Sequence, residues 1–305
     1  MIRGWHSLVL LGMGLMLAGC SWVSVGYNRL PDLARLWLDR QLKLEAPQAE
    51  VLMDDLKALH EWHKQQQLPL IATTLRRWQT LVVAESLSAD QVCQEMTQVR
   101  GLLSAVSTQA LPGMVRLARH LGPTQYAALQ ASQQKSHAEF RQLWLASPRR
   151  SWLPQAQAAD TDANQAQERL TQRVKLSQSR YEMLYGALSA AQLADLRHTA
   201  GASSFAPALA LAERERRSQD LLQTLKAIQA LPVSGDEAEA KALVQGWLDR
   251  LATSPDAAYA RASRVWQQET CTQWARLHQL STPEQRQHAR QLLAGYEADA
   301  QQLRR

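Results

Sequence analysis

The sequence predicts an all-α protein, folded as an elongated bundle or a stack of helical hairpins. Alanine, leucine, glutamine, arginine and glutamate dominate the chain, and these residues are strong helix formers. Only 2 Phe and 13 Gly occur among 305 residues. Apolar residues recur in steps of three and four, and no long stretch alternates apolar and polar residues as a half-buried strand does. Helices are therefore expected throughout.

The first element is an N-terminal signal sequence. An apolar run over 8–17 follows Arg3 in an otherwise uncharged start, and small residues precede Cys20. This order is typical of a secretory signal peptide. A cysteine directly after Leu-Ala-Gly is typical of a lipobox. The sequence therefore predicts a lipoprotein signal peptide over 1–19, ahead of the helices. Cys20 would then carry a diacylglycerol and an acyl chain such as palmitate. The alternative is a plain signal peptide or short membrane anchor that happens to contain a cysteine.

The acylated Cys20 and a short tether are expected over 20–27. No other apolar stretch approaches the roughly 20 residues needed to span a bilayer, so anchoring would rest on the acyl chains. Three chains exceed the two signals that stable attachment requires. Inner-membrane retention usually goes with Asp after the modified cysteine, so Ser21 favours the outer membrane, with the chain facing the periplasm.

The N-terminal helical region is predicted over 28–154. Apolar residues at helical spacing predict helices over 31–44, 47–67, 71–84, 88–111 and 123–145. Pro69 predicts a kink or short break, and Pro112-Gly113 predicts an interruption. The Ala- and Gln-rich stretch 155–164 is expected to be a linker or exposed loop. The C-terminal helical region over 165–305 has predicted helices at 165–188, 190–197, 207–231, 237–251, 255–280 and 283–303.

A recurring turn marks many of these helix starts. A leucine ends one helix, and an N-cap residue and a glutamine follow three positions apart: Ser88 with Gln91, Ser189 with Gln192, and Thr282 with Gln285. Looser versions end at Gln48 and Gln125. The hydroxyl would accept from a first-turn N–H and the glutamine would reach back to the cap, which forms a capping box. Each such start contributes about 1 kcal/mol, and the repeat predicts tight helical corners.

These turns resemble the Leu-Thr-x-x-Gln motif of small periplasmic helical-hairpin chaperones. The resemblance implies binding of unfolded chains on a concave, charged surface. Ser88 and Ser189 replace the threonine, and the turn at Thr282 has one extra residue before its glutamine. An ordinary helix corner explains the same pattern, because capping boxes are common.

A wider set of residues carries a second resemblance. It comprises the lipobox, Gly26-Tyr27-Asn28, Leu36 to Arg40, His60 to His63 with Leu68-Pro69, Arg180-Tyr181, Leu184 to Leu188, and Cys271 ahead of the Gln285 turn. Together they resemble an uncharacterised family of proteobacterial outer-membrane lipoproteins. The resemblance implies an all-helical periplasmic protein on an outer-membrane anchor, and it carries over no activity.

Two cysteines remain after Cys20. An oxidising compartment permits a disulfide between Cys93 and Cys271. Such a bond would close a long loop and could stabilise the fold by about 2–5 kcal/mol. The alternative is two separate buried thiols, which behave as small apolar residues. The pair lacks the spacing of a redox or zinc motif.

No catalytic motif stands out. His60 and His63 are three residues apart rather than the four of the zinc-protease motif, although such a pair can still share a helix face. A helix surface with two polar aromatic residues is the simpler interpretation, so we predict no metal site and no cofactor. Neither a nucleophile elbow nor a phosphate loop occurs. The formal charge of +6 is spread along the chain and does not indicate a nucleic-acid partner.

These observations favour a lipid-anchored periplasmic binding protein that is not an enzyme. Its partners would be the membrane, through the acyl chains on Cys20, and either unfolded periplasmic clients or one envelope protein. The chaperone-like, quality-control version rests on the cap turns. The alternative is a structural adaptor of a defined envelope complex, which requires a contiguous apolar or mixed patch on one helix face. A metal-dependent hydrolase using His60 and His63 is the third hypothesis.

Overall fold

The computed structural model describes residues 23–145, 155–232 and 237–304, with the backbone alone for 155–166. Within these ranges every regular element is a helix and no strand occurs, which confirms the predicted all-α class. The elements are α2 (Leu30–Leu42), α3 (Ala46–Trp62), the π-helix η1 (His63–Gln67), α4 (Leu68–Leu81), α5 (Ala89–His120), α6 (Pro123–Trp144), α7 (Gln155–Tyr185), α8 (Ala190–Ala202), α9 (Pro207–Gln229), α10 (Glu237–Ala252), α11 (Ala257–Gln279) and α12 (Pro283–Leu303).

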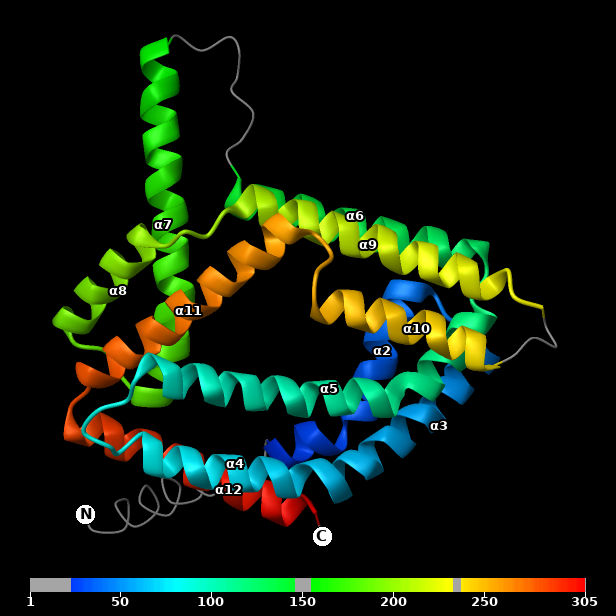
Figure 1. Cartoon of the computed structure of the whole chain (residues 1–305), viewed down its shortest axis with the longest axis horizontal. Coiled ribbons are helices and arrows are strands. Elements are labelled where there is room, and N and C mark those ends of the chain that lie inside the picture. Colours follow the sequence, from blue (N-terminus) through cyan, green and yellow to red (C-terminus); the bar gives the residue numbers. More distant parts are fainter. Residues whose placement is uncertain (1–22, 146–154, 233–236, 305) are drawn as a thin grey trace, which may run out of the picture.

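The helices pair along the edges of a flat frame (Figure 1). α3, η1 and α4 form one rod along one edge, and α12 lies beside α4. α6 and α9 pair along the opposite edge, while α5 and α10 lie between the two edges. α11 crosses the frame and contacts α5 and α8, and the start of α7 projects away from the body.

Two large hydrophobic cores hold the frame together, and a third, smaller cluster joins α4 to α12. The first is formed by buried side chains of α2, α5, α6, α9 and α10, with Val115 and Ile228 among the most buried. The second joins α7, α8, α11 and α12 around Tyr185 and Leu196. Both cores combine residues from the predicted regions 28–154 and 165–305. These regions therefore do not each fold around a core of their own.

Two predicted irregular segments are helical instead. Residues 155–164, expected to be a linker or loop, form the first turns of α7, so that expectation is wrong. Alanine and glutamine are strong helix formers, and no proline or glycine interrupts the stretch. Residues 23–27 of the expected tether over 20–27 are also helical. Cys20, Ser21 and the predicted signal peptide lie outside the described residues.

The internal prolines interrupt the helices less than expected. Pro69 lies in the first turn of α4, where a missing N–H costs little, and the preceding wide turn of η1 absorbs the change. Pro112 lies inside α5, which continues to His120. Its neighbours Leu111 and Val115, four residues apart on one face, are both buried in the first core. Tertiary packing therefore stabilises the helix at Pro112 although one backbone hydrogen bond is missing there.

All three clear capping boxes form as the sequence predicts. Ser88, Ser189 and Thr282 accept from the N–H of the glutamine three residues on, and that glutamine accepts from the cap N–H. At the two looser turns, Gln48 and Gln125 likewise accept from the N–H of Glu45 and Gly122.

The structure adds that four of these five glutamines meet in pairs, which we call glutamine corners. Gln192 Nε2 donates to Gln285 Oε1 over 2.9 Å and to the Leu280 carbonyl over 3.2 Å. Gln285 Nε2 donates in return to the Ala187 carbonyl over 2.8 Å.

Gln48 and Gln125, at the starts of α3 and α6, are hydrogen-bonded to each other in the same way. Each of them also donates to a backbone carbonyl at the turn of the other hairpin. In each case two helical hairpins meet at their turns: α2–α3 lies against α5–α6, and α7–α8 against α11–α12. The same four-helix arrangement therefore occurs twice in the chain.

A disulfide joins Cys93 on α5 to Cys271 on α11, with 1.98 Å between the sulfurs. The alternative of two separate thiols is therefore not what the structure contains. The bond links residues 178 apart in sequence and fastens the two repeated hairpin pairs to each other.

Candidate ligand-binding site

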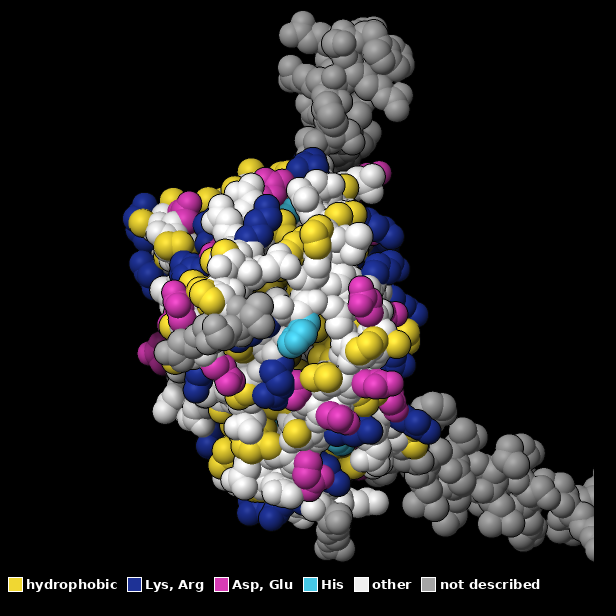
Figure 2. Space-filling view, turned by 90° about the vertical axis from the view of Figure 1, so that its right-hand side faces the viewer, with side chains coloured by type: hydrophobic (Ala, Val, Ile, Leu, Met, Phe, Trp, Pro, Cys, Tyr) yellow, Lys and Arg dark blue, Asp and Glu magenta, His cyan; other side chains and the backbone are white. Residues whose placement is uncertain are grey.

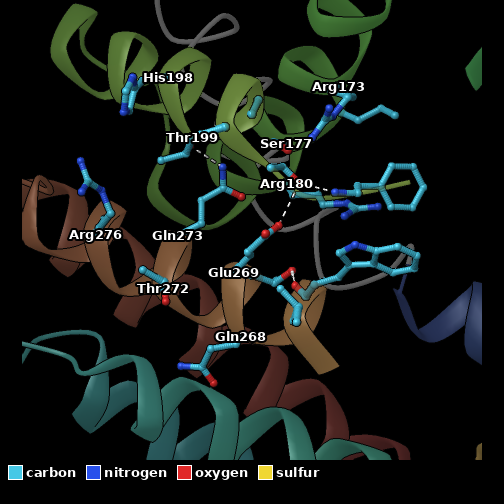
Figure 3. A pocket seen from close by; sticks show the side chains of 18 of the residues that line it. Arg173, Ser177, Arg180, His198, Thr199, Gln268, Glu269, Thr272, Gln273 and Arg276 are labelled. Carbon is cyan, nitrogen blue, oxygen red and sulfur yellow. Dashed lines mark hydrogen bonds between the residues drawn. The ribbon is translucent and has the colours of Figure 1, made fainter. Parts of the chain in front are cut away.

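A polar cavity lies between α7, α8 and α11, in the second of the two hairpin pairs. It has a volume of about 610 Å³. Figure 3 shows the side chains of α7 and α8 on one side and those of α11 on the other. The Ser203–Phe205 turn after α8 and Trp144 at the end of α6 complete the wall. The volume is within the roughly 300–1,000 Å³ that is usual for small-molecule sites.

α7 contributes two guanidinium groups, those of Arg173 and Arg180, which lie about two turns apart on the same face of the helix. Among the residues that the structure describes, neither has a hydrogen bond or an ion pair. Arg173 is half-buried, and this burial lowers its pKa while the charge of Glu269 opposes the change. A half-buried cation without a hydrogen-bonding partner is costly, so the cavity favours an anion beside Arg173.

The acidic side chain of the cavity is already engaged. Glu269 on α11 accepts from Ser203 Oγ over 2.9 Å and from the Ser204 N–H over 3.0 Å. Burial raises the pKa of Glu269, but these hydrogen bonds and the charge of Arg173 lower it by a larger amount. The net shift of the pKa is therefore downward. The carboxylate is therefore ionised at neutral pH and holds the turn after α8 in place.

The other polar groups of α11 are also held by neighbours. Gln273 Nε2 donates to Thr199 Oγ1 over 2.8 Å, and the Arg276 guanidinium is paired with Asp195. These bonds fix α11 against α8. Arg173 and Arg180 also line the cavity, and neither guanidinium group forms an ion pair with a carboxylate of the described residues.

One wall of the cavity is aromatic. The rings of Trp144 and Phe205 lie 5.4 Å apart between centroids, and those of Phe205 and Trp266 lie 5.0 Å apart, both edge to face. Such rings supply a large apolar surface with little conformational freedom to lose. The arrangement therefore suits a ligand that joins an anionic group to an apolar or aromatic body.

No sequence motif indicates this site. Arg180 belongs to the residues that carry the family resemblance, and Arg173, Glu269 and the aromatic wall belong to no motif. The consecutive helices α7 and α8 meet α11, which lies far from them in sequence, so no local spacing could have indicated the cavity. The predicted cap residues form helix corners, and the disulfide holds α5 to α11, so neither set lies in the cavity lining.

The histidine pair of α3 and η1 contacts a tyrosine. His63 Nδ1 is hydrogen-bonded to Tyr27 Oη over 2.8 Å, and the rings of Tyr27 and His60 lie 4.6 Å apart. His60 Nε2 is buried without a hydrogen-bond partner in the described part of the chain. Within that part, no three His, Cys, Asp or Glu side chains are grouped so that they could hold a metal ion. The geometry thus adds no third ligand to His60 and His63.

The fold and the cavity define an all-α protein of interleaved helical hairpins. The chain belongs to a family of unknown function, DUF6279, whose sequence model matches residues 40–234. The expected membership of an uncharacterised family is confirmed to that extent. The matched segment contains the α7 and α8 sides of the cavity and ends before α11. Comparisons with curated proteins and with solved structures find no significant match.

Proposed function

We propose that the protein is a non-catalytic binding protein of the bacterial envelope, anchored to the outer membrane by lipid on Cys20 and facing the periplasm. Its ligand carries an anionic group, which the polar cavity takes up beside Arg173. The single observation that carries this proposal is a half-buried guanidinium, unpaired among the described residues, in a cavity whose one carboxylate is already hydrogen-bonded. Arginine recognises carboxylate and phosphate through paired N–H donors.

The anchored location rests on the lipobox and gains support from the start of the fold. Leu30, Leu33 and Trp37 of α2 follow one another at spacings of three and four and are 46%, 52% and 60% exposed. Such a stripe, close to the proposed anchor, suits contact with a bilayer surface or a partner. Within the described ranges, no helix has the length and apolar character needed to cross a bilayer.

The chaperone-like version and the adaptor version differ in what they bind. A chaperone of the predicted kind needs a broad charged surface, yet on the face shown in Figure 2 the cationic and anionic side chains are interspersed. The apolar stripe of α2 is the patch that an adaptor requires, and it is the specific observation that favours this second candidate. In-cell crosslinking separates them, since one dominant protein partner supports the adaptor and many immature envelope proteins support the chaperone.

Binding of simple aromatic anions tests the cavity directly. We would titrate the full chain with phenyl phosphate, inorganic phosphate and phenol while following tryptophan fluorescence, because Trp144 and Trp266 line the wall. Phenyl phosphate should bind at least tenfold more tightly than either half alone. Replacing Arg173 with glutamine should weaken its binding at least tenfold, since it removes the charge and keeps most of the length.

The matched control is Arg261→Gln. Arg261 is an exposed arginine of α11 that does not line the cavity, so its replacement should leave binding unchanged. Equal binding by the Arg173→Gln variant and the unaltered protein would refute the site. The anchor is tested separately with labelled palmitate, which should be incorporated into the unaltered chain and not into Cys20→Ala.

A further inference from the structure

A second cavity, separate from the polar one, lies in the first hairpin pair. It has a volume of about 490 Å³ and lies between α2, α5, α6, α9 and α10. Thirteen of its 18 lining side chains are apolar, so the wall is chiefly leucine, with methionine and two tryptophans. No charged side chain is among them. An apolar hollow of this size is poorly hydrated and leaves its lining without contacts, which an apolar ligand would restore.

Burial distinguishes the inner end of the cavity from its mouth. At the inner end, Leu121, Ile228 and Val244 are 2–4% exposed and belong to the first core. Trp37 also lines the cavity but is 60% exposed, so it marks the opening. The opening therefore adjoins the exposed apolar stripe of α2.

Four of the five polar side chains of the cavity come from α2 and α6, and the fifth is a threonine of α9. Gln41 of α2 is hydrogen-bonded to Ser132 of α6. Next to Ser132, Gln133 has a buried side-chain oxygen without a hydrogen-bond partner in the described part of the chain. One turn further on, Ser136 accepts from Arg214 over 2.9 Å. Arg214 itself is exposed and its guanidinium lies 5.0 Å from the centre of the Phe140 ring.

The chemistry thus changes from apolar at the inner end to polar and cationic beside Ser136. An acyl chain with a polar or anionic head has the same order of groups. We propose that this cavity binds the acyl chain of an amphiphile, with the tail against Leu121 and Ile228 and the head near Ser136 and Arg214. A free fatty acid and a phospholipid share this chemistry, and the test below distinguishes them.

The cavity also lies where such a ligand is available if the proposed anchor is correct. α2 is the first long helix after Cys20, and its exposed stripe leads to the mouth at Trp37. This location supports the choice of occupant but is not needed for binding. The two cavities share no lining residue, so failure of one proposal leaves the other standing.

The experiment is photocrosslinking of the full chain in cells fed with a diazirine-bearing fatty acid, followed by mass spectrometry of the labelled peptides. We expect labels on the cavity walls, on peptides that contain Met114, Leu117 or Trp247. The Leu117→Trp variant fills the hollow and should reduce this labelling at least fivefold. The control, Leu103→Trp, places the same side chain on α5 where leucine is 62% exposed, and it should leave labelling unchanged.

Further variants keep the result decisive. If Leu117→Trp fails to fold, as judged by thermal melting, Leu221→Trp fills the same cavity from α9. Arg214→Gln should lower capture of the fatty acid several-fold and leave capture of an uncharged diazirine alcohol unchanged. A diazirine phospholipid of defined headgroup, supplied in vesicles, shows whether the source is a membrane lipid or a free acid. Absence of wall labelling, or labelling that persists in both filled variants, would overturn the proposal.

Discussion

At the scale of single residues, the structure assigns a protonation state to one fully buried histidine. His278 is 0% exposed, with Tyr185 Oη 2.9 Å from Nδ1 and the Ala84 carbonyl 2.9 Å from Nε2. The carbonyl can only accept, so Nε2 carries the hydrogen and Nδ1 accepts from the tyrosine. Burial lowers the pKa of His278, helped by the charge of Arg286 and opposed by the bond to Ala84. The neutral form is the one that the fold stabilises.

This assignment predicts a loss of stability in mild acid. Because the folded-state pKa lies below the ordinary value of about 6.5, the stabilising effect is full above that pH and declines as the pH falls below it. Urea unfolding at pH 7.5, 6 and 5 should show a falling free energy of unfolding. The decline should be shallower in His278→Gln than in a variant of the exposed His198. An equal slope in both variants would contradict the assignment.

Glu213 shows the opposite behaviour. It is 4% exposed and accepts from Arg216, Arg217 and Ser254. Burial raises the pKa of this carboxyl, but the three hydrogen bonds and the charge of Arg216 outweigh burial and lower it to about 2. Its stabilising effect is therefore present above the ordinary value of 4.5 and is lost as the pH falls toward 2.

We predict that Glu213→Gln lowers the free energy of unfolding by about 1.5–3 kcal/mol at pH 7, the usual range for hydrogen bonds to a charged group. Glu215→Gln is the matched control on the same helix. Glu215 pairs with Arg141 on the surface, where both side chains are over 40% exposed, and such pairs contribute about 0–1 kcal/mol. Chemical denaturation measures both. Similar losses in the two variants would argue against a special role for the buried carboxylate.

At the scale of elements, the capping turns were predictable because they depend on residues three positions apart in sequence. Ser88, Ser189 and Thr282 were identified for this reason. The meeting of the glutamines was not predictable, since Gln192 and Gln285 are 93 residues apart and each motif is complete without the other. The predictions of a linker over 155–164 and of an interruption at Pro112 were wrong for a related reason. Local composition does not show the packing that decides whether a helix continues.

The glutamine corners predict coupling between distant caps. Replacing Gln192 or Gln285 with alanine removes a cap contact and also leaves the partner amide unpaired. A double-mutant cycle should therefore give an interaction energy of about 0.5–3 kcal/mol. Pairing Gln91→Ala with Gln285→Ala is the control, because Gln91 caps its own helix and, among the described residues, its side chain is not hydrogen-bonded to another turn. Strict additivity for Gln192 and Gln285 would show that the corner contributes nothing beyond two separate caps.

At the scale of the whole molecule, the disulfide joins two hairpin pairs whose buried side chains belong to different hydrophobic cores. Chain-entropy arguments give about 2–5 kcal/mol for a bond that closes so long a loop. We expect reductant, or the Cys93→Ala/Cys271→Ala double variant, to lower the melting temperature. Reductant should have no further effect on the double variant. Mass measurement after alkylation, with and without reductant, checks the pairing itself. Unchanged melting on reduction would mean that packing alone holds α5 against α11.

The sequence by itself determined the helical class and the caps, and it predicts a lipid anchor; it left open whether Cys93 and Cys271 are bonded. Each of these depends on composition or on residues close together in the chain, where propensity, hydrogen-bonding reach and processing motifs operate. The tertiary structure alone decided the interleaving of the halves, the glutamine corners and both cavities. Arg173 and Glu269 are almost a hundred residues apart, and only the packing of α7 against α8 and α11 brings them to one cavity. A cavity is a property of surfaces that face each other, and no local pattern records which surfaces will do so.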